Sequence, residues 1–163
     1  MKEGKGKLVY KKTNDTYEGD FSNNDINGFG FYVWASNNHT YKGTFKSGKM
    51  NGKGTYTWPD GGEYYGDYIN NVKEGRGIFK WPNGREFDGP FANGKPHGVG
   101  MLTVGEKKQE AEFLDGKLNK GFRRSKTNIQ IQRENEQKGG QDAAAPNEAA
   151  ESFNDSNSKQ KIK

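Results

Sequence analysis

Glycines in Gly-x-Gly pairs are the residues of this chain whose spacing first suggests chemistry. Glycine-rich loops bind phosphate when they open a helix, because the N–H groups at a helix N-terminus point at the anion. Here no helical pattern follows any pair, and the flanking residues alternate as in strands. We therefore interpret the pairs as structural. They are Gly4/Gly6, Gly28/Gly30, Gly52/Gly54, Gly75/Gly77 and Gly98/Gly100.

The histidines and aspartates do not form a catalytic or metal-binding pattern either. His39 and His97 lie far apart in sequence, and the chain has no cysteine. Asp20, Asp67 and Asp88 each precede or follow a recurring glycine, at a spacing that predicts solvated carboxylates roughly 10 Å apart. No Ser–His–Asp, Gly-x-Ser-x-Gly or Walker pattern is present. The sequence predicts a non-enzymatic protein without a metal or cofactor.

The glycine pairs recur with a fixed period. Their first glycines are 24, 24, 23 and 23 residues apart. A second motif, aromatic-x-Gly-x-aromatic, keeps the same phase, as in Tyr41-Lys42-Gly43-Thr44-Phe45. Two motifs that share one period indicate a repeat array, and such arrays usually provide binding surfaces rather than reaction sites.

Each repeat has the pattern of a β-hairpin. The aromatic-x-Gly-x-aromatic motif has the two-residue period of a strand with one packed face, and the Gly-x-Gly pair is predicted to begin a second strand. Residues 47–51 would connect the two strands, and 59–62 would turn into the next hairpin. Because a lone hairpin is marginal, we expect the units to stack. The predicted fold is all-β, an elongated, twisted, single-layer antiparallel sheet on the order of 45 Å long.

The unit Tyr-x-Gly-x-Phe-x-x-Gly-Lys-x-x-Gly-x-Gly-x-Tyr-x-Trp-Pro-Asp-Gly resembles the MORN repeat (membrane occupation and recognition nexus). Residues 41–61 match it almost position for position, 64–84 and 87–104 follow closely, and 17–38 lack the Pro-Asp-Gly turn. The resemblance implies consecutive hairpins with a shallow aromatic groove over residues 3–118. These divide into a half repeat 3–15, repeats 16–39, 40–62, 63–84 and 85–106, and a cap 107–118.

The aromatic side chains are expected to form both the core and a binding groove. Packing alone would account for some rings, but a single-layer sheet cannot bury all of them. Rings left at the surface would bind a peptide or helix of a partner protein, with Trp34, Trp58 and Trp81 as the best candidates. The candidate groove residues are Tyr32, Trp34, Tyr56, Trp58, Phe79, Trp81, Tyr41 and Tyr64.

The excess positive charge lies just after the repeats. The formal net charge is +5, and residues 119–133 alone hold five basic residues and no acid. In segment 119–137, Ser125 would cap a short helix, and the segment would contact either anionic lipid or only solvent. The candidate anionic-surface residues are Lys120, Arg123, Arg124 and Lys126. Residues 138–163 are predicted to be disordered, and nucleic acid is disfavoured because the rings do not alternate with basic residues.

Known MORN proteins act as scaffolds at cytoskeletal and membrane structures, including ciliary axonemes. The resemblance therefore implies a non-catalytic scaffold or adaptor within a multi-subunit assembly, at a ciliary axoneme, a flagellum or the membrane cytoskeleton. The absence of a secretory signal or spanning apolar run favours a cytoplasmic location. The alternatives are a phosphoinositide- or anionic-membrane-binding module and an accessory fragment of a MORN-containing phosphoinositide kinase. Unpaired sheet edges would allow a homodimer.

Overall fold

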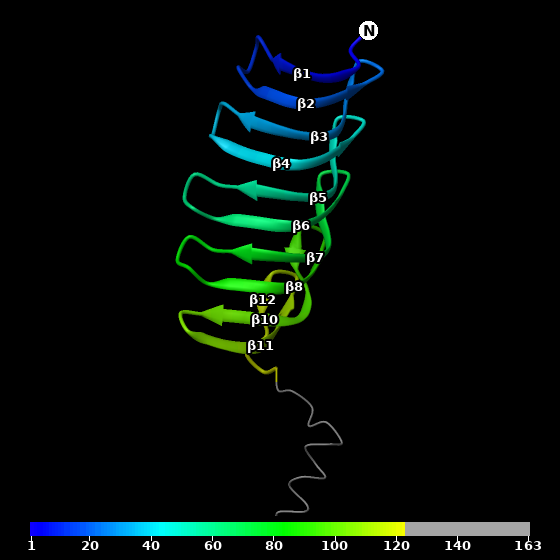
Figure 1. Ribbon diagram of the computed structural model, residues 1–163. Helices are drawn as coiled ribbons and strands as arrows, with labels where there is room; N and C mark the ends of the chain where they lie inside the picture. The colour runs from blue at the N-terminus through cyan, green and yellow to red at the C-terminus, as the bar shows by residue number, and fades with distance from the viewer. Residues whose placement is uncertain (123–163) are drawn as a thin grey trace, which may run out of the picture. The chain divides into compact units, whose positions relative to one another are not determined.

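The computed structural model describes residues 1–122, which form one 12-stranded antiparallel sheet (Figure 1). Strands that follow one another in sequence are hydrogen-bonded neighbours, with one exception. The short strand β9 pairs only with β8, and β8 also pairs with β10, which continues the sheet. The strands are β1 (Gly4–Val9), β2 (Thr16–Ser22), β3 (Asp25–Trp34), β4 (His39–Lys46), β5 (Lys49–Thr57), β6 (Glu63–Ile69), β7 (Val72–Lys80), β8 (Glu86–Ala92), β9 (Lys95–Pro96), β10 (Gly98–Val104), β11 (Lys107–Leu114) and β12 (Lys117–Leu118).

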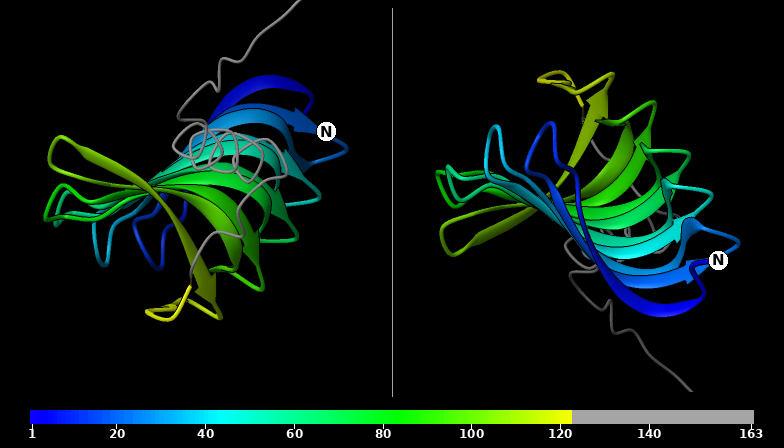
Figure 2. Two further views of the ribbon diagram at one scale, coloured as in Figure 1. Left: turned by 90° about the horizontal axis from the view of Figure 1, so that it is seen from below. Right: turned by 90° about the horizontal axis from the view of Figure 1, so that it is seen from above.

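The predicted all-β sheet of consecutive hairpins is confirmed, and these residues contain no helix. The sheet twists along its length and its strands are bent (Figure 2). No helix that could span a bilayer occurs in residues 1–122. From residue 123 on, the predicted helix of 119–137 and the predicted disorder of 138–163 lie outside the described residues.

Two-residue turns close the hairpins. Both residues of each turn have positive φ, as type I′ turns require, and Asn, Asp and Gly tolerate that geometry best. The turns are Asn23-Asn24, Ser47-Gly48, Asn70-Asn71, Asn93-Gly94 and Asp115-Gly116. The second strands therefore begin directly after the turn, three residues before the glycine pair in β3, β5 and β7. The prediction that the pairs begin the second strands is wrong for β3, β5 and β7, where the turn is only two residues long, and correct for β1 and β10, which begin at Gly4 and Gly98.

In β3, β5 and β7, the first glycine of the pair lies at an irregularity in the ladder. Gly28, Gly52 and Gly75 have φ values of 104°, 82° and 71°, a region that side chains other than glycine rarely adopt. The register of β2–β3, β4–β5 and β6–β7 shifts at the same places. These glycines thus allow a bulge that bends each hairpin.

The core is a line of rings on one face of the sheet. Tyr41 is fully buried, and its ring lies over Gly43 and Gly54. A methyl group at Gly54 would lie 2.3 Å from the Tyr41 hydroxyl oxygen, so the second glycine of the pair is required to make room for the ring. The Tyr41 hydroxyl donates to the carbonyl of Thr44 at 3.1 Å. The equivalent fully buried rings in the other repeats are Tyr17, Tyr64 and Phe87.

Turns also join successive hairpins. The N–H of Gly48 donates to the carbonyl of Ile26 at 2.9 Å. The N–H of Asn71 donates to Met50 at 2.9 Å, and that of Gly94 donates to Lys73 at 3.0 Å. Each hairpin is therefore attached to the one before it at its turn as well as along its strand.

Candidate binding groove

A continuous row of half-buried rings runs across the sheet beside the core. These rings, named here the aromatic row, come from β3, β5 and β7 and from the residues just after β5 and β7. Successive ring centroids in the row are 4.5, 5.4, 4.7, 5.5 and 4.8 Å apart, which is within the range of favourable aromatic contacts. The row consists of Tyr32, Trp34, Tyr56, Trp58, Phe79 and Trp81.

The predicted groove residues thus divide into two layers. The six rings of the aromatic row are half-buried and present an edge or face to solvent. Tyr41 and Tyr64 are fully buried, with 0% exposed surface, because each ring covers two glycines that face one another on neighbouring strands. These two tyrosines therefore support the groove from below and, contrary to expectation, offer no surface for direct contact with a partner.

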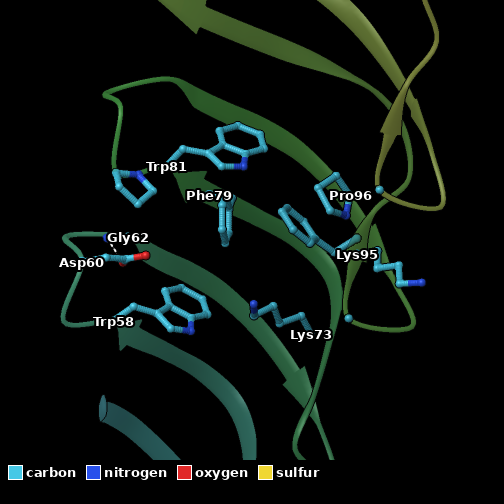
Figure 3. Close-up of a pocket in the computed structure, with 12 residues that line it drawn as sticks. Trp58, Asp60, Gly62, Lys73, Phe79, Trp81, Lys95 and Pro96 are labelled. Atoms are coloured by element: carbon cyan, nitrogen blue, oxygen red, sulfur yellow. Dashed lines mark hydrogen bonds between the residues drawn. The ribbon is translucent and has the colours of Figure 1, made fainter. Parts of the chain in front are cut away.

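The row leads into a hollow of about 450 Å³. Trp58, Phe79 and Trp81 form its aromatic wall, and Pro96 and Lys95 line the side formed by β9 (Figure 3). Bent strands place these side chains on the same side of the sheet, so three successive repeats contribute to one site.

Lys73 lies inside this hollow. Its amine is 4.4 Å from the ring centroid of Trp58, 5.0 Å from that of Tyr64 and 5.3 Å from that of Phe79. These distances are typical of cation–π contacts. Burial lowers the pKa of the Lys73 amine to about 8, because the charged form loses water contacts.

The sequence interpretation missed Lys73, although the repeat period contains the signal. Counting nine residues from the buried ring of each repeat gives Ile26, Met50, Lys73 and Pro96. Three of these residues are apolar, so a lysine at this position stands out once the repeats are aligned.

The histidines have structural partners. His39 Nδ1 is 2.7 Å from the Tyr56 hydroxyl oxygen, and its ring packs edge-on against Trp58. His97 Nδ1 lies 3.2 Å from a carboxylate oxygen of Asp115. Within residues 1–122, no three His, Cys, Asp or Glu side chains come together as metal ligands.

Two of the three recurring aspartates are more than solvated charges. Asp20 Oδ2 accepts a hydrogen bond from the N–H of Phe29 at 2.9 Å. Asp67 Oδ2 accepts one from the N–H of Arg76 at 3.3 Å. Both carboxylates thus satisfy backbone groups that the bulge leaves unpaired. Asp88 is half-exposed and pairs with Arg76 at 3.3 Å.

The opposite face of the sheet carries mixed charges and scattered rings. Lys53 and Asp67 form a cross-strand ion pair at 2.8 Å. Phe29 and Tyr65 are 52% and 49% exposed on this face. Of the candidate anionic-surface residues, Lys120 is exposed, whereas Arg123, Arg124 and Lys126 lie outside the described residues.

Comparison with known proteins agrees with this geometry. A family model of the MORN repeat, typically a non-catalytic module, matches residues 17–39, 41–63, 64–84 and 87–103. No curated protein matches the chain. The matched segments carry the four fully buried rings, four of the five glycine pairs and the aromatic row, and they cover about half of the sequence. The chain therefore belongs to the MORN repeat family, with four repeats in residues 17–103.

Proposed function

We propose that this MORN protein is a non-catalytic scaffold or adaptor that binds a segment of a partner protein along the aromatic row. The observation that carries the proposal is the continuity of six half-buried rings on one face. Rings that are partly covered are already held in place, so a partner removes their remaining apolar surface from water at little entropic cost.

The dimensions of the row favour a protein segment over a small molecule. The row extends from β3 to β7, four strand spacings apart, which corresponds to about 19 Å. That length matches about six residues of an extended chain or about 13 residues of a helix. A partner segment would contact two or three repeats at once.

Two alanine variants, Trp58→Ala and Tyr65→Ala, test the proposal. Trp58 is in the middle of the row, and Tyr65 is an exposed ring on the opposite face. Affinity purification of the full chain with lysine-reactive crosslinking should capture a partner through Lys73 or Lys95, which line the hollow. Trp58→Ala should weaken the free energy of binding to the captured partner by about 2 kcal/mol or more. Tyr65→Ala should leave this binding unchanged. Capture that survives Trp58→Ala in the folded variant would contradict the proposal.

The cellular setting is proposed from the family alone. Known MORN scaffolds act at axonemes and at the membrane cytoskeleton, and we propose one of these two places for this chain. Fluorescence localisation of the full chain in ciliated cells tests this setting, and a uniform cytosolic distribution would count against it.

A further inference from the structure

Lys73 occupies a position that the fold otherwise gives to apolar residues. Ile26 is 5% exposed in the first complete repeat, and Met50 packs against the core in the second. Lys73 follows at the same repeat position in β7, and its chain also points to the ring-lined side of the sheet. A charged group in such a place costs stability, so local sequence and fold disagree here. Disagreements of this kind concentrate at functional sites.

The ammonium of Lys73 contacts rings but has no ion-pair partner among residues 1–122. Nearby carboxylates are engaged elsewhere. Asp60, which lines the same hollow, accepts the N–H of Gly62 at 2.9 Å. Glu74, the next residue along β7, accepts the N–H of Asn93 at 2.9 Å. Lys73 therefore keeps donors available in a hollow that is otherwise mainly apolar.

We propose that Lys73 recognises a carboxylate of the partner, so that the segment bound along the aromatic row carries an aspartate or glutamate between apolar residues. This inference rests on the proposed function and specifies its partner class. Burial leaves the Lys73 amine largely protonated at neutral pH, since the pKa falls only to about 8. A carboxylate would restore the charge balance that the groove lacks.

A carboxylate fits this hollow better than a phosphate. Figure 3 shows the Lys73 amine pointing between Trp58 and Phe79, whereas Lys95 points away from the rings. The Arg85 guanidinium lies 5.2 Å from the Trp81 ring centroid, so that ring already holds it. One inward ammonium among rings suits a single negative charge with apolar neighbours, while a phosphate dianion needs several donors.

Selection of peptides tests the inference. Random peptides of about twelve residues, which can span the row, are displayed and selected on the full chain. The same library is selected on Lys73→Met and on Lys95→Met. We expect peptides from the wild type and from Lys95→Met to be enriched in an acidic residue flanked by apolar ones. Peptides from Lys73→Met should lack the acidic residue.

A binding cycle then measures the contact. Changing the acidic residue of a selected peptide to its amide should raise the Kd for the wild type about tenfold or more. The same change should alter the Kd for Lys73→Met less than about twofold. Met50 fills the equivalent position, so Lys73→Met is expected to fold. Lys73→Gln serves as a second neutral variant, and the melting curves of both are recorded.

The outcomes separate the two proposals. Selected peptides without acidic preference, whose binding is lost in Trp58→Ala, would overturn the role of Lys73 and leave the proposed function standing. A library that yields no binder, or only binders insensitive to Trp58→Ala, would contradict both. Capture of phosphatidylserine vesicles that depends on Lys73 would identify lipid as the occupant and overturn the carboxylate proposal. A dimer that Lys73→Met dissociates would likewise overturn it in favour of a second copy.

Discussion

Replacing Lys73 by methionine should stabilise the sheet at neutral pH. Burial moves the pKa of this amine from its ordinary 10.5 to about 8. At 1.36 kcal/mol per unit, that shift sets a ceiling of about 3 kcal/mol on the cost of burying the charge. The amine is partly exposed, and the variant loses cation–π contacts worth about 0.5–2 kcal/mol. We therefore expect a net gain of about 1–2 kcal/mol at pH 7.

The pH dependence of this gain follows from the direction of the shift. Below pH 8 the lysine is protonated in both states, so the folded wild type bears the whole cost of the buried charge. Between pH 8 and 10.5 the folded state loses the proton first, so the wild type becomes more stable relative to the variant as pH rises. The advantage of Lys73→Met should consequently shrink between pH 7 and about pH 9.5.

Denaturant unfolding of the full chain at these two pH values measures the effect. The difference between variant and wild type cancels contributions from the tyrosines, which both proteins share. Lys46→Met, at an exposed position at the end of β4, is the control and should change the free energy of unfolding by less than about 0.5 kcal/mol. If Lys73→Met is less stable than the wild type at pH 7, or its effect is the same at both pH values, the assignment of Lys73 as a buried, uncompensated charge is refuted.

Two further predictions concern the core, and a third concerns segment 119–137. Tyr68→Phe should stabilise the sheet by about 1 kcal/mol in thermal or urea unfolding, because the buried Tyr68 hydroxyl has no hydrogen-bond partner among residues 1–122. The equivalent positions hold Phe21, Phe45 and Phe91, and a loss of stability would show that the hydroxyl is satisfied. Gly54→Ala should lower the free energy of unfolding by about 3 kcal/mol or more, since the added methyl group would overlap the Tyr41 ring. Gly61→Ala, at a glycine with positive φ and open space around it, should lower it by only about 1 kcal/mol. Equal losses would rule out the explanation that the ring needs the space above Gly54. If segment 119–137 contacts anionic lipid, phosphatidylserine liposomes should capture the full chain, and added salt should weaken this capture. Capture should be lost when Arg123, Arg124 and Lys126 become Gln, since each contributes about 1 kcal/mol to membrane binding. Capture unchanged by these substitutions would exclude a lipid site in this segment.

The repeat period and the alternation of rings with polar residues predicted the strands, because a strand with one packed face must alternate. The exact turns were less well predicted. Ser47-Gly48 and Asn70-Asn71 have the residue types of type I′ turns, after which the second strand begins. The glycine pair lies three residues later, and the sequence pattern placed the start of the strand at that pair instead. The bulge at Gly52 separates these two signals, and a bulge depends on pairing with the neighbouring strand, which a linear pattern does not contain.

The division of rings between core and groove could not be predicted from spacing. Tyr41 and Tyr56 are both rings in alternating strand positions and are directly paired across β4 and β5. They differ because the Tyr41 ring lies over Gly43 and Gly54, whereas Tyr56 stands in the aromatic row between two tryptophans. Which ring covers the glycines is settled by side-chain direction in a bent sheet. Lys73, by contrast, was predictable from the aligned repeats alone.

The sequential pairing of the strands has a mechanical consequence. Each hairpin is bonded to the next along one strand and at its turn, and the ends of the sheet belong to the first and last hairpins. A pull on the two ends would load the hydrogen bonds of one junction at a time, so the sheet should peel open in steps of one hairpin at low force. Because each hairpin closes between residues near in sequence, it should re-form quickly when tension falls. An attachment built this way would behave as an extensible tether rather than as a rigid strut.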